Sequence, residues 1–242
     1  MLQSERENQM TRQPHQDAHV VRACFSRVGN IVYIGHLDLM RTFERSLRRA
    51  GLPILHTQGY NPRPSLVFAL PLGVGIATVD DYIDIFLAEP VESTELIMRL
   101  NDKLPEGLHI SEAWSVPDGG PSLMSIVTAA SYRLTAPGIF PGLQKLLLRE
   151  DIPVMKRSKG AMKLTDIRPF ILSISETSTL ENEADVFVMA GSSRNLRPDL
   201  LLQALNQYEG FDRRVVDNCE VVRTGLYVGE YPSIIRIGQM PR

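Results

Sequence analysis

Hydrophobic and polar residues alternate in some stretches of the chain and follow a helical period in others. Between Val20 and Val28 apolar and polar side chains alternate, which is typical of a strand. Over His36–Ala50 apolar residues recur at spacings of three and four, which predicts a helix that ends at Gly51. The predicted buried face of this helix consists of Leu37, Met40, Phe43, Leu47 and Ala50.

The remaining pattern predicts two halves with a similar order of elements. After the first strand and its extension over Ile31–Ile34, the first half contains the helix, a short strand Ile54–Thr57, a loop Gln58–Pro64, strands Ser65–Leu70 and Asp81–Ala88, a helix Thr94–Leu104 and a strand His109–Ser115. This is the order of a split βαβ, or ferredoxin-like, unit. The second half contains strand Ala130–Thr135, helix Gly142–Arg149, a hairpin of Ile152–Lys156 with Phe170–Ser175 around Ser158–Gly160, strand Asp185–Ala190, helix Pro198–Gln207 and strand Val215–Val228.

The two halves predict an α+β fold made of tandem ferredoxin-like units with mainly antiparallel sheets. A single larger α+β domain is the alternative. The predicted boundaries are a disordered tail at 1–19, a first domain at 20–117, a linker at 118–128, a second domain at 129–230 and a C-terminal tail at 231–242.

Composition narrows the class of protein. The chain has 242 residues, of which 43% are hydrophobic and 22% charged, and its net charge of −2 gives no bulk attraction to nucleic acid or to an anionic membrane. The N-terminus lacks the apolar segment of a signal peptide, and the longest apolar run, Leu66–Ala77, is too short to span a bilayer. We therefore expect a cytoplasmic protein that is not a membrane protein.

Cysteine and histidine usage argues against a cofactor. Cys24 and Cys219 are far apart in apolar stretches, which favours two reduced thiols over a disulfide. No group of Cys or His residues has metal-ligand spacing, and no three-cysteine cluster for an iron–sulfur centre is present. We expect neither a metal nor another cofactor.

Candidate binding residues in the first half lie on the first helix and in the following loop. Arg41, Arg45 and Arg48 fall on one helix face, where they either solubilise the surface or bind phosphates. The loop Gly59–Pro64 offers the residues Tyr60, Asn61 and Arg63 for stacking, hydrogen bonding and charge.

In the second half, basic residues gather around one turn and before one helix. The predicted contact residues here are Lys156, Arg157, Arg168, Arg194 and Arg197, with Lys159 and Lys163 close to the same turn. Such positions are either ordinary surface residues or contacts to a nucleic-acid backbone.

Candidate catalytic residues are fewer. His36 opens the first helix, and together with His56 or Tyr60 it is a conceivable acid–base pair for RNA cleavage. A capping or buried role for His36 is the alternative.

Several blocks of sequence resemble the radical-SAM-linked protein family, a bacterial domain of unknown function. The resemblance covers Val20–Val228 and rests on the blocks Gly35–Arg41, Phe43–Leu52, Gly59–Pro62, Phe68–Gly73, Asp166–Pro169 and Arg197–Leu201. Members are fused to cobalamin-binding radical SAM proteins or encoded beside them. The resemblance implies that this chain accompanies a separate radical SAM protein, with RNA or ribosome-related modification as the expected process. It implies no catalytic residues.

Three functions follow as hypotheses. The first is a non-catalytic accessory module that binds RNA or presents a substrate to a radical SAM partner. The second is a protein–protein adaptor that docks through the Gly59–Pro64 loop without nucleic acid. The third is an RNA-processing or RNA-modifying enzyme that uses His36 or Tyr60. The sequence leaves the oligomeric state open.

Overall fold

The computed structural model describes residues 18–58, 60–117, 121–158, 160–176, 181–191 and 194–240. Residues 1–17 of the predicted tail, Gly59 of the loop, 118–120 of the predicted linker, Lys159 of the basic turn, and 241–242 of the C-terminal tail lie outside the described residues. The first strand begins at His19.

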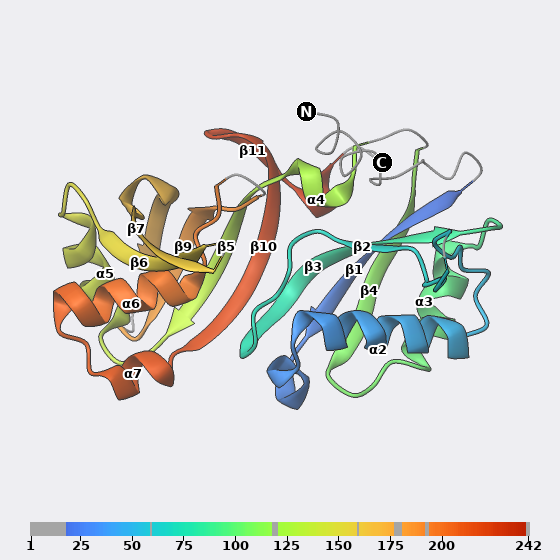
Figure 1. Cartoon of the computed structure of the whole chain (residues 1–242), viewed down its shortest axis with the longest axis horizontal. Helices are drawn as coiled ribbons and strands as arrows, with labels where there is room; N and C mark the ends of the chain where they lie inside the picture. The colour runs from blue at the N-terminus through green and yellow to red at the C-terminus, as the bar shows by residue number, and fades with distance from the viewer. Residues whose placement is uncertain are drawn as a thin grey trace.

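The first half of the chain forms one end of a large sheet (Figure 1). Its elements are β1 (His19–Arg27), η1 (Gly29–Tyr33), α2 (His36–Arg49), β2 (Leu66–Phe68), β3 (Ile76–Leu87), α3 (Ser93–Asn101) and β4 (Leu108–Val116). The strands lie in the order β4-β1-β3, with β2 paired to β3, and all these pairings are antiparallel.

The second half forms the other end of the same sheet. Its elements are α4 (Leu123–Ile126), β5 (Val127–Thr135), α5 (Ile139–Leu147), β6 (Pro153–Ser158), β7 (Ala161–Asp166), η2 (Arg168–Phe170), β8 (Ile171–Glu176), β9 (Glu183–Met189), α6 (Pro198–Glu209), α7 (Arg213–Asp217), β10 (Glu220–Glu230), β11 (Ser233–Arg236) and η3 (Ile237–Gln239). The strand order is β10-β5-β9-β8, with β11 paired to β10. Among the described residues, strands β6 and β7 pair only with each other and form a separate two-stranded ribbon.

The two ends join through β3 and β10, which run side by side near the middle of the molecule (Figure 1). This pairing is parallel and extends from Ile76 opposite Val221 to Thr78 opposite Arg223. The result is a nine-stranded, mostly antiparallel sheet, so the predicted α+β class with mainly antiparallel strands is confirmed. We call the region where β3 meets β10 the seam.

Helix α2 packs against the sheet through a slightly different face from the predicted one. Leu39, Phe43 and Leu47 have no exposed surface, whereas Leu37, which was predicted to face inward, is 66% exposed. The period of the pattern was correct, but Leu39 takes the place of Leu37 because Leu39, Phe43 and Leu47 follow one another at spacings of four on the buried face. The ring of Phe43 lies 5.2 Å from that of Phe25 in an edge arrangement, which anchors the helix on β1.

Some predicted elements differ in the structure, and one of them is the strand Ile54–Thr57, where Ile54 and His56 form only isolated bridges. Ile31–Ile34 belongs mainly to the 3-10 helix η1 rather than to an extended strand. The predicted hairpin of Ile152–Lys156 with Phe170–Ser175 does not form, since β6 pairs with β7 across a short turn and β8 pairs with β9. The irregular start predicted at Val215 is the short helix α7, whose N-cap side chain, Asp212, accepts a hydrogen bond from the backbone N–H of Arg214.

Candidate functional site

The arginines of α2 form an exposed stripe on the side of the helix that faces away from the core. Arg41, Arg45 and Arg48 are all exposed. Arg41 donates to Asp38 over 2.9 Å, so its charge is partly compensated. Arg45 and Arg48 make no ion pair with any residue that the structure describes. The stripe therefore presents two uncompensated guanidinium groups to solvent.

The loop after α2 is closed at its base and open at its tip. The backbone N–H of Thr57 donates to the carbonyl of Arg63 over 2.7 Å, and the N–H of Arg63 donates to the Thr57 hydroxyl over 3.1 Å. Tyr60 is 100% exposed, and Asn61 and Arg63 are exposed as well. A fully exposed aromatic ring on a closed loop is available for contact with another molecule.

The β6–β7 ribbon concentrates positive charge in the second half. Its register places Lys156 directly opposite Lys163 and Arg157 opposite Met162. Arg157 and Lys163 are exposed, and Lys156 is half-buried. None of the three basic side chains makes an ion pair with the part of the chain that the structure describes. Met155, Met162 and Leu164 are 42%, 58% and 62% exposed, so the same ribbon also carries apolar surface.

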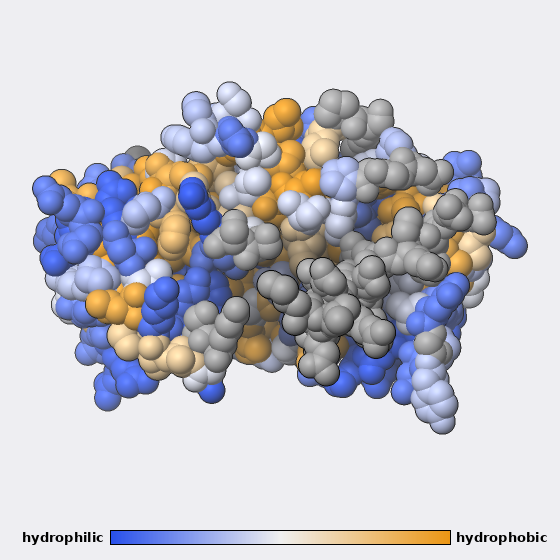
Figure 2. Space-filling view, turned by 45° about the horizontal axis from the view of Figure 1, so that its top comes forward, coloured by the Kyte–Doolittle hydropathy of each residue, from blue (hydrophilic) through white to orange (hydrophobic). Residues whose placement is uncertain are grey.

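A mixture of hydrophobic and hydrophilic surface appears over the half of the molecule that carries this ribbon (Figure 2). The Lys156 ammonium donates to the carbonyl of Asn195 over 3.2 Å and so ties the ribbon to the segment before α6. Arg194 and Arg197 lie in this segment and are exposed, although Arg197 pairs with Asp199 at 2.8 Å. The structure thus brings the predicted basic turn and the Arg194–Arg197 segment together.

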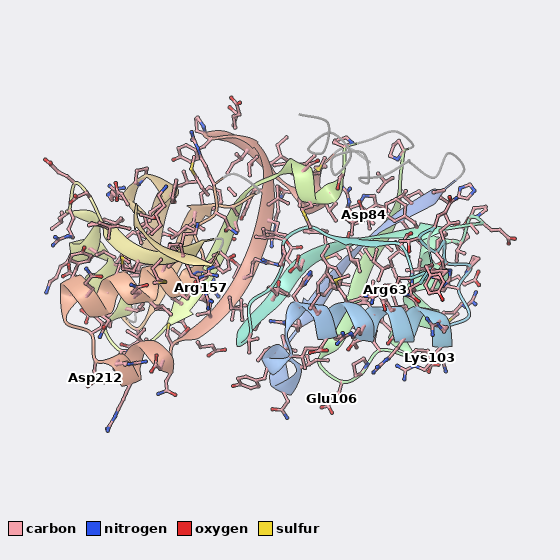
Figure 3. The ribbon with its side chains drawn as sticks, viewed as in Figure 1. Arg63, Asp84, Lys103, Glu106, Arg157 and Asp212 are labelled. Carbon is pink, nitrogen blue, oxygen red and sulfur yellow. The ribbon has the colours of Figure 1, made fainter. Side chains whose placement is uncertain are left out.

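The other predicted residues are not part of this group. Arg168 is half-buried at the start of η2, at the end of the ribbon opposite its turn. Arg63 appears in the half that contains α2, whereas Arg157 appears in the half that contains α6 (Figure 3). The predicted binding residues therefore form two groups on different halves of the molecule.

His36 turns inward rather than capping its helix. Its ring packs edge-on against Phe68 with 5.3 Å between ring centroids, and its Nδ1 atom is buried without a hydrogen-bond partner. Burial and the positive charges of Arg223 and Arg27 lower the pKa of His36 below its usual value. The imidazole is therefore neutral at pH 7.

His36 does not lie beside the residues with which it was considered as an acid–base pair. His56 is exposed, and its neighbour Leu55 bonds to Phe86 near the C-terminal end of β3. His36 instead lies near Arg27 and Arg223, both of which are in register with Thr78 toward the N-terminal end of β3.

The buried arginines at the seam were missed by the sequence analysis. Arg27 has no exposed surface and Arg223 is 1% exposed. Arg223 forms an ion pair with the buried carboxylate of Asp81 and donates to the carbonyl of Leu70 over 2.8 Å. Burial alone would lower the pKa of Arg223, but Asp81 and Tyr132 raise it, so the guanidinium remains charged. A signal existed in the sequence, because Arg223 interrupts an apolar run in which a solvated charge is unexpected.

The thiols and the buried carboxylate of Asp80 make contacts within the fold. Cys24 and Cys219 are unpaired. The Cys24 thiol and the Tyr82 hydroxyl both donate to Asp80, and Arg236 donates to the same carboxylate over 2.7 Å. This contact fixes β11 to β3. The described residues contain no group of three or more His, Cys, Asp or Glu side chains arranged to hold a metal ion. In that part of the chain no helix is long and apolar enough to cross a membrane.

Known proteins give one informative similarity. No curated protein matches the chain. Residues 21–198 match the family model described as an uncharacterized protein conserved in bacteria (DUF2344). Since these residues make up most of the 242, the chain belongs to this uncharacterized bacterial family.

Proposed function

We propose that the protein is an RNA-binding accessory module built from two ferredoxin-like units. In each half, two strand–helix–strand segments follow one another, and the strand orders β4-β1-β3-β2 and β10-β5-β9-β8 correspond position by position. This correspondence supports a tandem arrangement of units with the β-α-β-β-α-β order. The β6–β7 ribbon is then an addition to the second unit, and additions of this kind are available for function.

The observation that carries the RNA proposal is the direct pairing of Lys156 and Lys163 across the ribbon. Like charges directly opposite one another destabilise a strand pair. Arg157 adds a third positive charge on the other face of the ribbon, and no carboxylate among the described residues pairs with any of the three. A polyanion that bound here would relieve this repulsion, and phosphate groups are the polyanionic part of RNA.

The chemistry of the ribbon also suits single-stranded RNA better than a rigid duplex. Lys and Arg contact phosphates, while the exposed apolar side chains of Met155, Met162 and Leu164 provide non-polar contacts for unstacked bases on the face of the ribbon that carries Arg157. Arg45 and Arg48 on α2 supply a second cationic surface on the other half. An RNA that contacted both halves would be held at two places.

The accessory part of the proposal comes from the resemblance to the radical-SAM-linked family. In this proposal the chain works in the cytoplasm beside a separate radical SAM enzyme and delivers RNA or another substrate to it. The described residues bring no catalytic group next to the ribbon, and His36 and Tyr60 lie in different surroundings. The proposal therefore assigns the chemistry to the partner.

The experiment is a binding titration with a fluorescently labelled single-stranded RNA, followed by anisotropy at several salt concentrations. The variant carries Lys156→Ala, Arg157→Ala and Lys163→Ala together. For single strands each lost phosphate contact reduces the slope of log K against log salt by about 0.7. Loss of three contacts should therefore weaken binding and reduce the slope by about 2.

A matched control removes the same number of charges elsewhere. Lys103, Lys145 and Arg213 are exposed and lie outside the ribbon, so their combined replacement by alanine changes the net charge equally. Binding by this control should remain close to wild type. Equal losses in both variants, or no binding by wild type at low salt, would refute the proposal.

A protein–protein adaptor is the second candidate, and the complete exposure of Tyr60 favours it. Aromatic side chains are enriched in the centres of protein interfaces. Under this candidate, a radical SAM partner co-purifies with the protein after nuclease treatment, and Tyr60→Ala abolishes the association. Association that disappears with the nuclease would instead support the RNA proposal.

A further inference from the structure

The seam contains a concentration of unsatisfied buried nitrogen atoms. Among the residues that the structure describes, three buried side-chain nitrogen or oxygen atoms lack a hydrogen-bond partner, namely Arg27 Nε, His36 Nδ1 and Arg223 Nε. Their residues are neighbours, because the charges of Arg27 and Arg223 act on each other and both act on His36. Buried polar atoms without partners are rare, and an ion or water commonly accounts for those that exist.

The sheet register explains how the two arginines come together. Arg27 on β1 and Arg223 on β10 are both in register with Thr78 on β3, so the three residues form one row across three strands. The remaining nitrogens of Arg27 are held in place. Its Nη2 donates to the carbonyls of Gly73 and Ile76, each over 2.6 Å, and its Nη1 donates to the carbonyl of Ile34 over 3.4 Å. Both guanidinium groups are therefore fixed before any ligand binds.

The charge of the cluster is not balanced. Two guanidinium groups share one carboxylate, that of Asp81, which pairs with Arg223. The cluster therefore has an excess of one positive charge, with His36 neutral. An arginine Nε–H can only donate, so the missing partner of each arginine is an acceptor. An acceptor that also compensates positive charge is an anion.

The N-terminus of α2 lies at the same place and favours the same kind of ligand. The carbonyl that Arg27 contacts belongs to Ile34, the residue before the N-cap Gly35. No side chain caps this helix, and the first backbone bonds to Gly35 come from Asp38 and Leu39. The N–H groups at the start of a 14-residue helix are thus available, with the positive end of the helix dipole.

There is open space beside this N-terminus. A Cβ atom added to Gly35 would meet nothing within 4 Å, and the same is true of Gly75, whose N–H bonds to the Val32 carbonyl in the preceding η1. Gly35 has φ −71° and ψ 164°, an extended conformation that any residue adopts. Glycine is therefore not required here by the backbone, and its bare surface lets a ligand approach the helix N-terminus.

We propose that Arg27, His36, Arg223 and the N-terminus of α2 form a binding site for a phosphate-class oxyanion. In this proposal the anion enters beside Gly35, accepts hydrogen bonds from the first N–H groups of α2 and supplies the acceptor that the Nε–H groups of Arg27 and Arg223 lack. The ligand that supplies this oxyanion is either a free phosphate compound or a nucleic acid with a phosphate group. The site is separate from the β6–β7 ribbon and does not depend on the proposed RNA function of the ribbon.

The first arm of the test uses inorganic phosphate alone with the full chain. The ring resonances of His36 are followed by NMR while phosphate replaces chloride at constant ionic strength, and the Tm is measured in parallel. We expect saturable shifts of the His36 signals. At ten times the Kd, the Tm should rise by about 3–6 °C, as expected for a ligand that binds only the folded chain.

The principal variant is Gly35→Leu, which fills the open approach without straining the backbone. Retained circular dichroism with a Tm that no longer responds to phosphate is the expected result. His36→Phe preserves the ring packing on Phe68 but removes both ring nitrogens, and it should weaken the phosphate response at least several-fold. Arg45→Ala is the control, because it removes an exposed charge from the same helix and should leave the response unchanged.

The second arm distinguishes the two sources of the phosphate group. A short oligonucleotide with a 5′-phosphate is compared with the same oligonucleotide ending in a hydroxyl. A stronger effect of the phosphorylated form on His36 than of inorganic phosphate identifies a nucleic-acid ligand, and the reverse identifies a free phosphate compound. The inference is overturned by unchanged His36 signals with both probes, or by equal responses of wild type and Gly35→Leu. The ribbon variant should keep the phosphate response, so failure of the RNA proposal and failure of this one are separable.

Discussion

The ion pair between Asp81 and Arg223 predicts a large and specific loss of stability. Both side chains are 1% exposed, and Asp81 also accepts a hydrogen bond of 2.8 Å from the backbone N–H of Tyr82. Replacing Asp81→Asn keeps the shape of the side chain and leaves an oxygen that can still accept from Tyr82. The substitution removes the negative charge and one of the two acceptor oxygens, so the two buried guanidinium groups of Arg27 and Arg223 lose their carboxylate.

The expected magnitude follows from the burial. Removing one member of a buried ion pair costs about 3–5 kcal/mol, mostly because the other charge remains buried without compensation. Asp81 accepts from Tyr82 through one oxygen and from Arg223 through the other, whereas the single amide oxygen of asparagine can accept from only one of them. The expected loss is therefore at least the lower value, about 3 kcal/mol. Such a loss is a large part of the total stability of an ordinary domain, about 5–15 kcal/mol.

Asp185→Asn is the matched control. Asp185 pairs with Arg133 through two hydrogen bonds of 2.9 and 3.1 Å, but these two side chains are 32% and 41% exposed. Because solvent screens this pair, its loss should cost about 1 kcal/mol or less. The exposed pair makes two hydrogen bonds and the buried pair makes one, so a larger loss at Asp81 would come from its burial rather than from a better hydrogen-bond geometry.

The assay is urea unfolding at pH 7, followed by circular dichroism and analysed for both the free energy of unfolding and the m-value. Asp81→Asn should lower the free energy by about 2 kcal/mol more than Asp185→Asn, with an unchanged m-value. Equal losses in the two variants would show that the seam does not hold an uncompensated charge. The seam would then have no excess positive charge to attract an anion.

Three further predictions concern individual side chains. Since the pKa of His36 is lower in the folded chain than in the unfolded chain, folding stability should fall as the pH drops through and below about 6.5, and His36→Phe should reduce this loss in urea unfolding between pH 5 and 7. Burial raises the pKa of the Cys24 thiol to about 12 and that of Cys219 to about 11, so at pH 8 both should react with iodoacetamide more than ~10-fold more slowly than a free thiol and react rapidly in urea. Tyr60→Ala should change the free energy of unfolding by less than about 0.5 kcal/mol, because the ring is wholly exposed, and a larger loss would mean that the loop packs on the protein.

Local patterns in the sequence were sufficient for most of the helices and strands. The period of α2 and its end at Gly51 could be predicted because one face of the helix is buried and Gly51 adopts φ +63°. The pairing partners were harder to predict. Phe170–Ser175 has a plausible strand pattern, but nothing local shows that it pairs with β9 rather than with Ile152–Lys156. Strand pairing depends on which distant segment reaches the same edge, and alternation does not encode that choice.

Because local patterns do not encode contacts between distant segments, only some of the candidate site residues could be found from the sequence. Arg41, Arg45 and Arg48 were recognisable because a helix period places them on one face, and the structure leaves all three exposed. Arg27 and Arg223 were not recognisable as neighbours, because they are far apart in the chain and meet only through their common register with β3. A charge inside an apolar strand was the available signal for Arg223, but its partner could not be inferred.

The extent of the family match has a physical consequence for the unit that folds. The matched residues end at Pro198, the first residue of α6, but β10 lies beyond them, between β3 and β5 in the sheet. Without β10 these two strands would lose their common neighbour, and Asp81 would lose its pairing with Arg223. The seam and its cluster of buried nitrogens thus require residues from outside the matched region. The folding unit of this chain therefore includes β10. Any property of the seam belongs to the whole sheet rather than to the matched segment alone.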